Sequence, residues 1–458
     1  MKVIDPASGE TLAEIQEDDK DSISLKYRES RSAMRYWTTM RVPDRIGIMW
    51  RFHDLIEKNE NLLAKILTSE VGKPIRQSHN ELRGGRNRIR YFLSNCEKWL
   101  AEELIHQGDD MTERITYEPL GVIANISAWN YPWLVGINVF VPALIGGNAV
   151  LYKPSEFATL TGQKICELLS EAGIPKGVMQ CIAGGAAAGQ ALLNLPLDGY
   201  FFTGSYRTGQ KIFEQAAKKI VPVQMELGGK DPLYVTDDNS DLAKVAAAAA
   251  EGAFYNAGQS CCAVERIYVH QSVYQKFLDL FVEEVRKFKI GNPLEENTFI
   301  GPLTRTEQIR VLELQVADAK EKGGRILLGG KPLDGPGNFF NPTIIADASH
   351  SMLLMKEESF GPLIGIMKVE HDEEAVTLMQ DTEYGLTAAV YSDEFSRAEK
   401  IMNQMNVGTV YWNCCDRVSP NVPWSGRKHS GIGSTLSQIG IRAFVRPKAW
   451  QMRGDVRD

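Results

Sequence analysis

The chain has 458 residues, of which 43% are hydrophobic and 24% are charged, and its formal net charge is −7. A chain of this length exceeds one ordinary hydrophobic core, so we expect two or three domains. The balance of residues is typical of a globular protein in water, and the acidic charge argues against a nucleic-acid partner, which usually meets a clustered basic face.

The cysteines give no sign of a disulfide framework or of a zinc site. Seven are present, an odd number with two adjacent pairs and no CxxC spacing: Cys96, Cys166, Cys181, Cys261, Cys262, Cys414 and Cys415. The N-terminal sequence MKVIDPASGE becomes polar after four residues and contains no apolar signal core. We therefore expect a reducing compartment, the cytoplasm, and no metal site.

Residues 20–105 come first in chain order and predict long helices with polar faces. Apolar residues recur there at helical spacing, as in IGIMWRFHDLIEKNENLLAKIL.

Farther along, residues 131–152 contain no charged side chain and are long enough to cross a bilayer. Asn138, Pro142 and the sequence Gly-Gly-Asn interrupt this segment before the strand-like AVLY. We therefore expect a buried helix that ends at the glycines, then a buried strand, and no membrane partner.

From about residue 115, short apolar runs alternate with helical patterns. The runs GVIANI, AVLYKP, GVMQCIAG and YFFTGS predict buried strands, and the helices between them are expected at 158–172, 186–194 and 207–218. This alternation predicts a parallel sheet with crossover helices, a Rossmann-like architecture.

A second α/β stretch follows ELGGK (226–230), with predicted strands in DPLYVTD, ERIYVHQ and GTVYWN and a helix at 271–288. It indicates another mostly parallel sheet, and no linker separates the two stretches. Two more segments alternate like strands, MTERITYEPLG (111–121) and IRAFVRPKAWQMR (441–453). They could pair and project as an oligomerisation element, or each could be an edge strand of a core sheet.

Cys261 and Cys262 follow an alanine-rich helix that runs into Gly258. A buried pair of cysteines is most often core packing, whereas a reactive cysteine needs a polar, electropositive setting. Glu226 stands at the end of the apolar run VPVQM, where a carboxylate held partly out of water can act as a general base. Taken alone, Glu226 is more simply a solvated strand end.

Three more motifs are ambiguous when taken singly. Asn130 follows a strand, where its amide can donate to an oxyanion or stabilise a turn. FFTGSYRTG (201–209) places a Gly-Ser turn before a helix, where backbone N–H groups can bind phosphate. LYKPSE (151–156) ends a strand with Lys153 and Glu156, and an acid there can bind ribose hydroxyls.

Together and in this order, the motifs resemble the aldehyde dehydrogenase superfamily. They are WNYP, KPSE, FTGS, ELGGK, GQSC, ESFGP (358–362), YGLTAAV (384–390) and PWSGRKHSG (423–431). The resemblance implies an α/β fold with a Rossmann-type cofactor domain, a second α/β catalytic domain and a small β oligomerisation element. The expected boundaries are 1–105 with 120–227 for the NAD-binding domain, 228–432 for the catalytic domain, and 106–119 with 440–458 for the oligomerisation strands.

The resemblance also implies a reaction, the oxidation of an aldehyde to a carboxylic acid with reduction of NAD. Cys261 would be the nucleophile and Cys262 would not. The Asn130 amide and the Cys261 backbone N–H would hold the oxyanion of a thiohemiacetal. After hydride transfer leaves a thioester, Glu226 would activate the water that hydrolyses it.

For the cofactor, the resemblance places Lys153 and Glu156 at the adenosine ribose and Gly204 with Ser205 at the pyrophosphate. The other cofactor-binding residues that it implies are Trp129, Leu227, Glu358 and Phe360, of which the last two fall at the nicotinamide ribose and ring. A carboxylate such as Glu156 accepts from a 2′-hydroxyl and repels a 2′-phosphate, so NAD is favoured over NADP.

The implied substrate pocket consists of Tyr131, Val135, Asn138, Ser260, Asp416, Val418 and Trp424. Asn138 and Val418 replace residues that are often aromatic, which indicates a roomier and more polar tunnel. Arg417 could attract a substrate carboxylate, although pairing with Asp416 or exposure to solvent is the simpler interpretation. Tyr131 and Trp424 could instead form part of a cage for a quaternary amine.

The chain departs from the family pattern near the general base. Val139 stands where many members carry a lysine, and Thr435 and Gln438 stand where many carry glutamates. We therefore expect Glu226 to lose its proton by another route, such as water, with altered deacylation.

Two alternatives stay open, a coenzyme A-acylating semialdehyde dehydrogenase and a non-catalytic relative. Glu226 argues against the first, and the presence of Cys261, Asn130 and Glu226 together argues against the second. A homodimer or homotetramer acting on a small aldehyde is expected.

Overall fold

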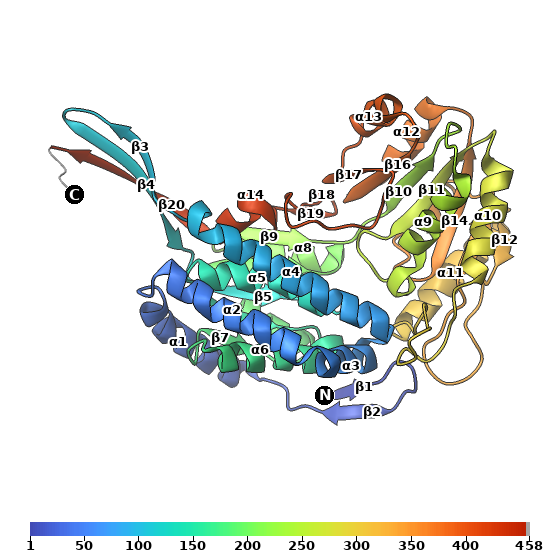
Figure 1. Ribbon diagram of the computed structural model, residues 1–458. Coiled ribbons are helices and arrows are strands. Elements are labelled where there is room, and N and C mark those ends of the chain that lie inside the picture. The colour runs from blue at the N-terminus through green and yellow to red at the C-terminus, as the bar shows by residue number, and fades with distance from the viewer. Residues whose placement is uncertain (455–458) are drawn as a thin grey trace.

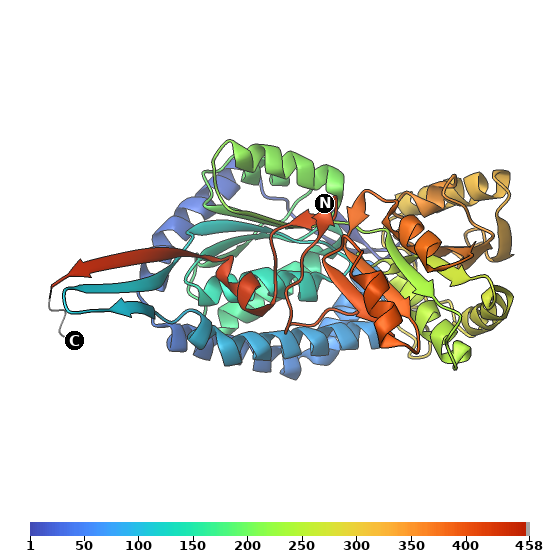
Figure 2. The ribbon, with the colours of Figure 1, turned by 90° about the horizontal axis from the view of Figure 1, so that it is seen from above.

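The structure is a computed structural model that describes residues 1–454. Two helix-covered sheets form two lobes, and a separate three-stranded sheet projects from the first lobe, as Figure 1 and Figure 2 show. The α/β architecture predicted from the sequence is confirmed.

The first lobe begins with a short hairpin and four helices. The hairpin strands β1 (Lys2–Ile4) and β2 (Thr11–Glu14) pair in antiparallel fashion. The helices are α1 (Lys20–Trp37), α2 (Val42–Lys58), α3 (Glu60–Val71) and α4 (Ile75–Trp99). Each buries one apolar stripe and leaves polar residues outside, which confirms the helices predicted for 20–105.

The sheet of this lobe has the order β19-β9-β8-β5-β6-β7. Its strands are β5 (Val122–Ile126), β6 (Ala149–Lys153), β7 (Met179–Cys181), β8 (Gly199–Thr203), β9 (Val223–Glu226) and β19 (Gly431–Ile432). All pairs are parallel except β19 with β9. The connecting helices are α5 (Pro132–Ile145), η1 (Glu156–Ala158), α6 (Thr159–Ala172), α7 (Ala186–Leu193) and α8 (Tyr206–Ala217).

The strand order of this sheet reverses between β5 and β8. Ligands of open α/β sheets bind at such a switch point, beyond the carboxyl ends of the strands. Three of the sequence motifs, those of Asn130, Gly204 with Ser205, and Glu226, lie at these ends of β5, β8 and β9.

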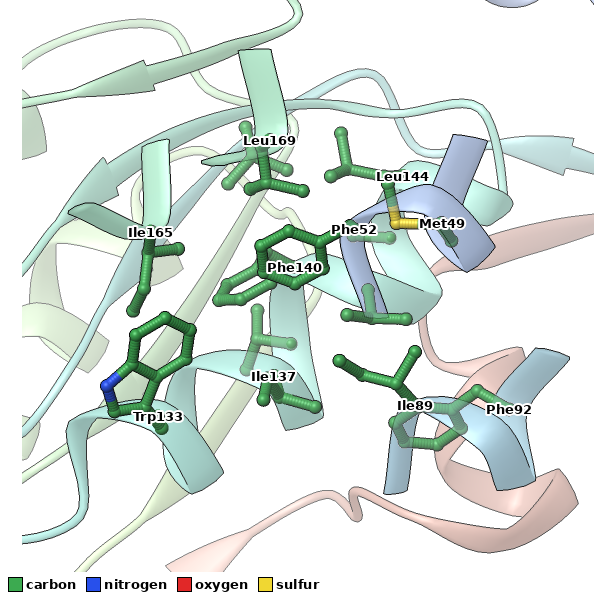
Figure 3. Close-up of a cluster of buried hydrophobic side chains, with 14 of the residues drawn as sticks. Met49, Phe52, Ile89, Phe92, Trp133, Ile137, Phe140, Leu144, Ile165 and Leu169 are labelled. Atoms are coloured by element: carbon green, nitrogen blue, oxygen red, sulfur yellow. The ribbon is translucent and has the colours of Figure 1, made fainter. Parts of the chain in front are cut away.

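Helix α5 explains the uncharged segment 131–152. It is buried on nearly all sides and ends at Gly146 and Gly147, after which β6 begins, as predicted. Figure 3 shows its residues Ile137, Phe140 and Leu144 packed among side chains of α2, α4 and α6. Within residues 1–454, no helix is long and apolar enough to cross a membrane.

The second lobe contains a seven-stranded sheet of order β12-β13-β14-β11-β10-β16-β17. Its strands are β10 (Asp231–Val235), β11 (Val264–His270), β12 (Arg325–Leu328), β13 (Thr343–Ala346), β14 (Leu363–Val369), β16 (Thr387–Tyr391) and β17 (Thr409–Trp412). Only β12 with β13 is antiparallel, so the second mostly parallel sheet is confirmed.

Helices and short elements complete the second lobe and its connections. They are α9 (Leu242–Phe254), η2 (Tyr255–Gly258), α10 (Tyr274–Arg286), α11 (Glu307–Glu321), η3 (Leu353–Met355), α12 (Asp372–Gln380), β15 (Tyr384–Gly385), α13 (Phe395–Met402), β18 (Arg427–Lys428) and α14 (Ser437–Arg442). Helix α10 is the one predicted at 271–288, slightly shortened.

The projecting sheet decides between the two interpretations of the segments 111–121 and 441–453. Strand β20 (Val445–Arg453) pairs along its whole length with β4 (Met111–Pro119), and β3 (Glu103–Gln107) forms the other edge. Their order is β20-β4-β3, and none of them joins a core sheet within residues 1–454. The domain boundaries stay a prediction, and residues 455–458 of the segment 440–458 lie outside the described part.

Candidate active site

A cleft with a volume of about 550 Å³ lies at the carboxyl ends of β5, β8 and β9, and residues of the second lobe line its other side. The predicted residues that line it are Trp129, Asn130, Gly204, Ser205, Glu226, Leu227, Cys261, Glu358 and Phe360. The structure therefore brings together, from both lobes, all three predicted catalytic residues and most of the predicted cofactor-binding residues.

Cys261 is presented by a backbone turn that ordinary residues rarely adopt. After α9, the φ angles of Asn256, Ala257 and Gly258 are 54°, 55° and 69°, all in the left-handed region. A Cβ on Gly258 would collide with the backbone oxygen of Gly361 in the ESFGP motif. Only glycine therefore lets the GQSC and ESFGP motifs touch.

Buried amides hold the Cys261 turn against the loop that follows β5. The Asn130 Nδ2 donates to the Gln259 carbonyl at 3.1 Å, and the Asn256 Nδ2 donates to the Asn130 carbonyl at 3.3 Å. The Gln259 amide is held in turn, because its Oε1 accepts from Thr304 N–H at 2.9 Å. Asn130 uses one N–H in this network, which leaves the second N–H of its amide for another acceptor.

The two adjacent cysteines differ in their surroundings. Cys261 lines the cleft and is partly exposed, whereas Cys262 is buried. The Cys262 Sγ donates to Asp416 Oδ1 at 3.1 Å. The neighbouring Cys261 sulfur and burial raise the pKa of Cys262 well above its ordinary value, so its thiol stays protonated at neutral pH.

Glu226 is buried at the end of β9. Its Oε1 accepts from Gln224 Nε2 at 2.8 Å and from Thr435 Oγ1 at 3.1 Å, and its Oε2 has no partner among residues 1–454. Burial raises the pKa of Glu226 well above its ordinary value, although both donors act to lower it. Val139 is buried in the apolar core and Gln438 is exposed on α14, so of the three departures only Thr435 contacts the carboxylate.

The glycines of ELGGK allow this motif to touch two others. A Cβ on Gly228 would lie 2.5 Å from both carboxylate oxygens of Glu358, and one on Gly229 would lie 2.6 Å from the Cys261 carbonyl oxygen. The Gly229 N–H donates to Glu358 Oε1 at 3.1 Å. Burial and the nearby Glu265 raise the pKa of Glu358 to about 8.

The groups around the cleft fit a dinucleotide. Gly204 and Ser205 lie between β8 and the N-terminus of α8, a place that favours phosphate, and Ser205 caps that helix. The Glu358 carboxylate can accept from ribose hydroxyls, and the rings of Trp129 and Phe360 meet edge to face with centroids 5.5 Å apart.

Lys153 and Glu156 lie apart from these groups, beyond the carboxyl end of β6. Lys153 is buried and its Nζ donates to the Pro154 carbonyl, whereas Glu156 is exposed. Neither residue lines the cleft, so their contact with the cofactor stays a prediction.

The predicted substrate residues lie mostly behind Cys261, between α5 and the 414–424 loop. Trp424 is buried and exchanges backbone hydrogen bonds with Thr435, and Val418 packs against the same core. Asp416 accepts from Ser260 Oγ at 3.3 Å and from Cys262. Of the two simpler interpretations of Arg417, exposure to solvent is confirmed and pairing with Asp416 is not seen among the described residues, because the Asp416 carboxylate turns inward.

Sequence reasoning missed several charged and aromatic groups near the site. Tyr206 and His429 stack with ring centroids 3.9 Å apart on the cleft wall. Lys73, Glu81 and Arg88 are buried beside the substrate residues of α5. A signal was present for the two on α4, because Glu81 and Arg88 are next to Leu82 and Ile89 on the apolar stripe of that helix.

Comparison with known proteins agrees with the geometry. The family model described as "Aldehyde dehydrogenase family" matches residues 1–450. A betaine aldehyde dehydrogenase of Cereibacter sphaeroides is 33% identical over 451 residues, which cover 98% of this chain and 93% of that protein. A probable succinate-semialdehyde dehydrogenase [NADP(+)] of Sinorhizobium fredii is 32% identical over 98% of this chain and 92% of that protein.

Solved structures extend the likeness to three dimensions. The crystal structure of a betaine aldehyde dehydrogenase from Staphylococcus aureus in complex with NAD⁺ matches with a TM-score of 0.95 at 31% sequence identity. The match covers 100% of this chain and 92% of that one.

The turn before Cys261 yields a stability prediction. Gly258→Ala places a methyl group against the Gly361 carbonyl and strains φ, so the free energy of unfolding should fall by about 3 kcal/mol in urea denaturation. Gly9→Ala is the matched control, because Gly9 has a similar φ of 79° and open space around its Cβ position, and it should cost about 1 kcal/mol. Equal losses in the two variants would contradict the close packing of the two motifs.

Proposed function

The chain belongs to the aldehyde dehydrogenase family, and from this premise we propose that it is a hydrolytic, NAD-linked enzyme whose acyl intermediate is carried by Cys261. Oxidation of an aldehyde to its acid with NAD(P) is what the family and its relatives support. The observation that carries the finer proposal is that one cleft gathers Cys261, Asn130 and Glu226 with the groups that fit a dinucleotide.

In the first half of the reaction, the Cys261 thiolate attacks the aldehyde carbon and a C–S bond forms. The carbonyl oxygen becomes an oxyanion, which the free N–H of the Asn130 amide and the Cys261 backbone N–H stabilise. NAD(P)⁺, when bound, supplies the hydride acceptor. The acyl group then remains on Cys261 as a thioester.

In the second half, Glu226 accepts a proton from water while the water oxygen adds to the thioester carbon. The C–S bond breaks, the carboxylic acid leaves and the Cys261 thiolate is restored. Glu226 also argues for water over coenzyme A as the acyl acceptor, because a base at this place serves hydrolysis. Product analysis with and without coenzyme A separates the two.

The preference for NAD over NADP is supported by Glu156. Its exposed carboxylate follows β6, the strand next to β5, and in the proposed binding mode it would accept from a ribose hydroxyl of the dinucleotide. A 2′-phosphate there would be repelled by the negative charge of the Glu156 carboxylate.

We also propose that the enzyme works in the cytoplasm, whose reducing conditions would keep Cys261 a thiol.

The proposed reaction predicts distinct behaviour of two variants. Absorbance at 340 nm follows NADH or NADPH formation with a panel of aliphatic aldehydes, benzaldehyde, succinate semialdehyde and betaine aldehyde. Wild type should turn over with NAD, and Cys261→Ser should be inactive. Glu226→Gln should release about one equivalent of NADH per active site and then stop at the thioester, which mass spectrometry would detect. Steady turnover by Glu226→Gln would exclude Glu226 as the required base.

The surroundings of Glu226 predict a pH dependence. Below its raised pKa the carboxyl keeps its proton and cannot accept one from water, so thioester hydrolysis should slow as the pH falls through that pKa. Thr435→Val removes a donor that stabilises the ionised form, so the acidic limb should move to higher pH. Thr435→Ser keeps the hydroxyl and is the control. The rate of acyl-enzyme hydrolysis is measured at each pH in quenched single-turnover experiments. Identical pH–rate profiles for the valine and serine variants would contradict the role of Thr435.

We propose that the projecting sheet joins copies of this chain into a homodimer or homotetramer. Its edge strand β3 leaves backbone groups unpaired and exposes Leu104 and Ile105 by 58% and 57% of their surface. Such an edge is a template for pairing with another chain. Leu104→Lys with Ile105→Lys should reduce the assembly in sedimentation experiments, whereas Leu314→Lys, at an equally exposed leucine on α11, should not. A monomeric wild type would overturn the proposal.

A further inference from the structure

Arg88 is a buried cation without an acidic partner. Its side chain is 7% exposed, and no carboxylate among residues 1–454 lies within ion-pair distance of its guanidinium. Burial lowers the pKa of Arg88 to about 10, so it stays charged at neutral pH. Burying an unpaired charge is costly, so a group of this kind usually has a ligand or a functional reason.

The guanidinium is held on one side and free on the other. Its Nη1 donates to Asn138 Oδ1 at 2.9 Å and to the Leu134 carbonyl at 3.3 Å. Its Nε and Nη2 donate to no atom of the described residues, which leaves their N–H groups for an acceptor from outside them. Two neighbouring N–H groups of a guanidinium match the two oxygens of a carboxylate.

The position of Arg88 relates it to the reacting cysteine. It lies on the face of α4 that packs on the first turns of α5, directly after the Asn130 loop. Burial is the largest influence on the pKa of Arg88 and lowers it, but Cys262, Glu81 and Cys261 all lie near enough for a negative charge on any of them to raise it. The next residue, Ile89, belongs to the apolar cluster of Figure 3, so little water screens this charge.

The other ionisable groups near this region have partners within the protein, a buried ion pair in one case and neutral hydrogen-bond donors in the other. Lys73 and Glu81 form a buried ion pair, and Glu81 also accepts from the Trp133 N–H at 2.9 Å. Asp416 accepts from Ser260 and Cys262, and burial raises its pKa to about 7. Arg88 is therefore the positive charge in this region that pairs with no acidic side chain of the described residues.

The same region is unsuited to a quaternary amine. The Lys73 Nζ lies 3.7 Å from the centroid of the Tyr131 ring, so one aromatic face that a substrate cation would need is occupied by a cation of the protein. Arg88 adds like-charge repulsion, and Asn138 offers no aromatic surface.

We propose that Arg88, oriented by Asn138, binds the distal carboxylate of the substrate, which is therefore an aldehyde acid, a semialdehyde. This inference rests on the proposed function, because the aldehyde end must reach Cys261. Among the relatives reported above, the chain would resemble in this respect the succinate-semialdehyde enzyme more than the betaine aldehyde enzymes.

The test compares three aldehydes that differ in the charge of the distal group: succinate semialdehyde, its methyl ester and betaine aldehyde. Wild type should give the highest kcat/KM with succinate semialdehyde. Arg88→Met should lower that value by about 100-fold, as expected when one partner of a desolvated charge pair is lost, and the loss for the methyl ester should be at least about tenfold smaller. Arg88→Lys should fall between. Arg90→Met, at an exposed arginine of the same helix, is the control and should match wild type.

Two outcomes would overturn the inference: equal losses for the acid and its ester in Arg88→Met, or a wild-type preference for betaine aldehyde. Failure of the proposed function would look different, since wild type would then oxidise none of the three aldehydes. Binding still decides the role of Arg88 in that case. Succinate, with NAD present, should raise the Tm of wild type and of Arg90→Met but not of Arg88→Met, and an equal rise in all three would overturn the inference.

Discussion

The buried amides of Asn130, Asn256 and Gln259 join the two lobes beside Cys261, at the cleft. Each of these side chains hydrogen-bonds to the next one or to its backbone. Because a buried amide that loses its partner costs free energy, these hydrogen bonds hold the residues in place. The turn that presents Cys261 has a left-handed backbone, and these hydrogen bonds, with the contact of Gly258 and Gly361, keep it in that conformation. Cys261 and the Asn130 amide are thereby held in position by the fold itself.

Glycines allow the motifs of the site to converge. Gly228 lets Glu358 approach the ELGGK turn, and Gly229 lets the Cys261 carbonyl do the same. Because these residues come from different strands and loops, the cleft forms only when both sheets are in place. In the region behind Cys261, Lys73 pairs with Glu81 and Asp416 accepts from neutral donors, whereas Arg88 has no acidic partner among the described residues. This unpaired charge is the means of substrate selection that we propose.

Much of the fold was predictable, because the pattern of apolar residues reports which face of each element is buried. The runs GVIANI and YFFTGS became β5 and β8, and the helices between the strands appear within a few residues of the predicted bounds. Short strands such as β15, β18 and β19 were not predicted. They have two residues each and depend on pairing with distant segments, which leaves no local pattern.

The family, the reaction class and the candidate residues around Cys261 could be read from the sequence, because they depend on motifs whose residue types are required by chemistry and close packing. The folded structure was needed to show how the segments 111–121 and 441–453 pair, since strand pairing is a long-range contact. It also decided that Thr435 touches Glu226, that Asp416 turns toward Cys262 and that Arg88 has no acidic partner among the described residues. The sequence gives the charge of a side chain, but the fold determines which group it pairs with and how deeply it is buried.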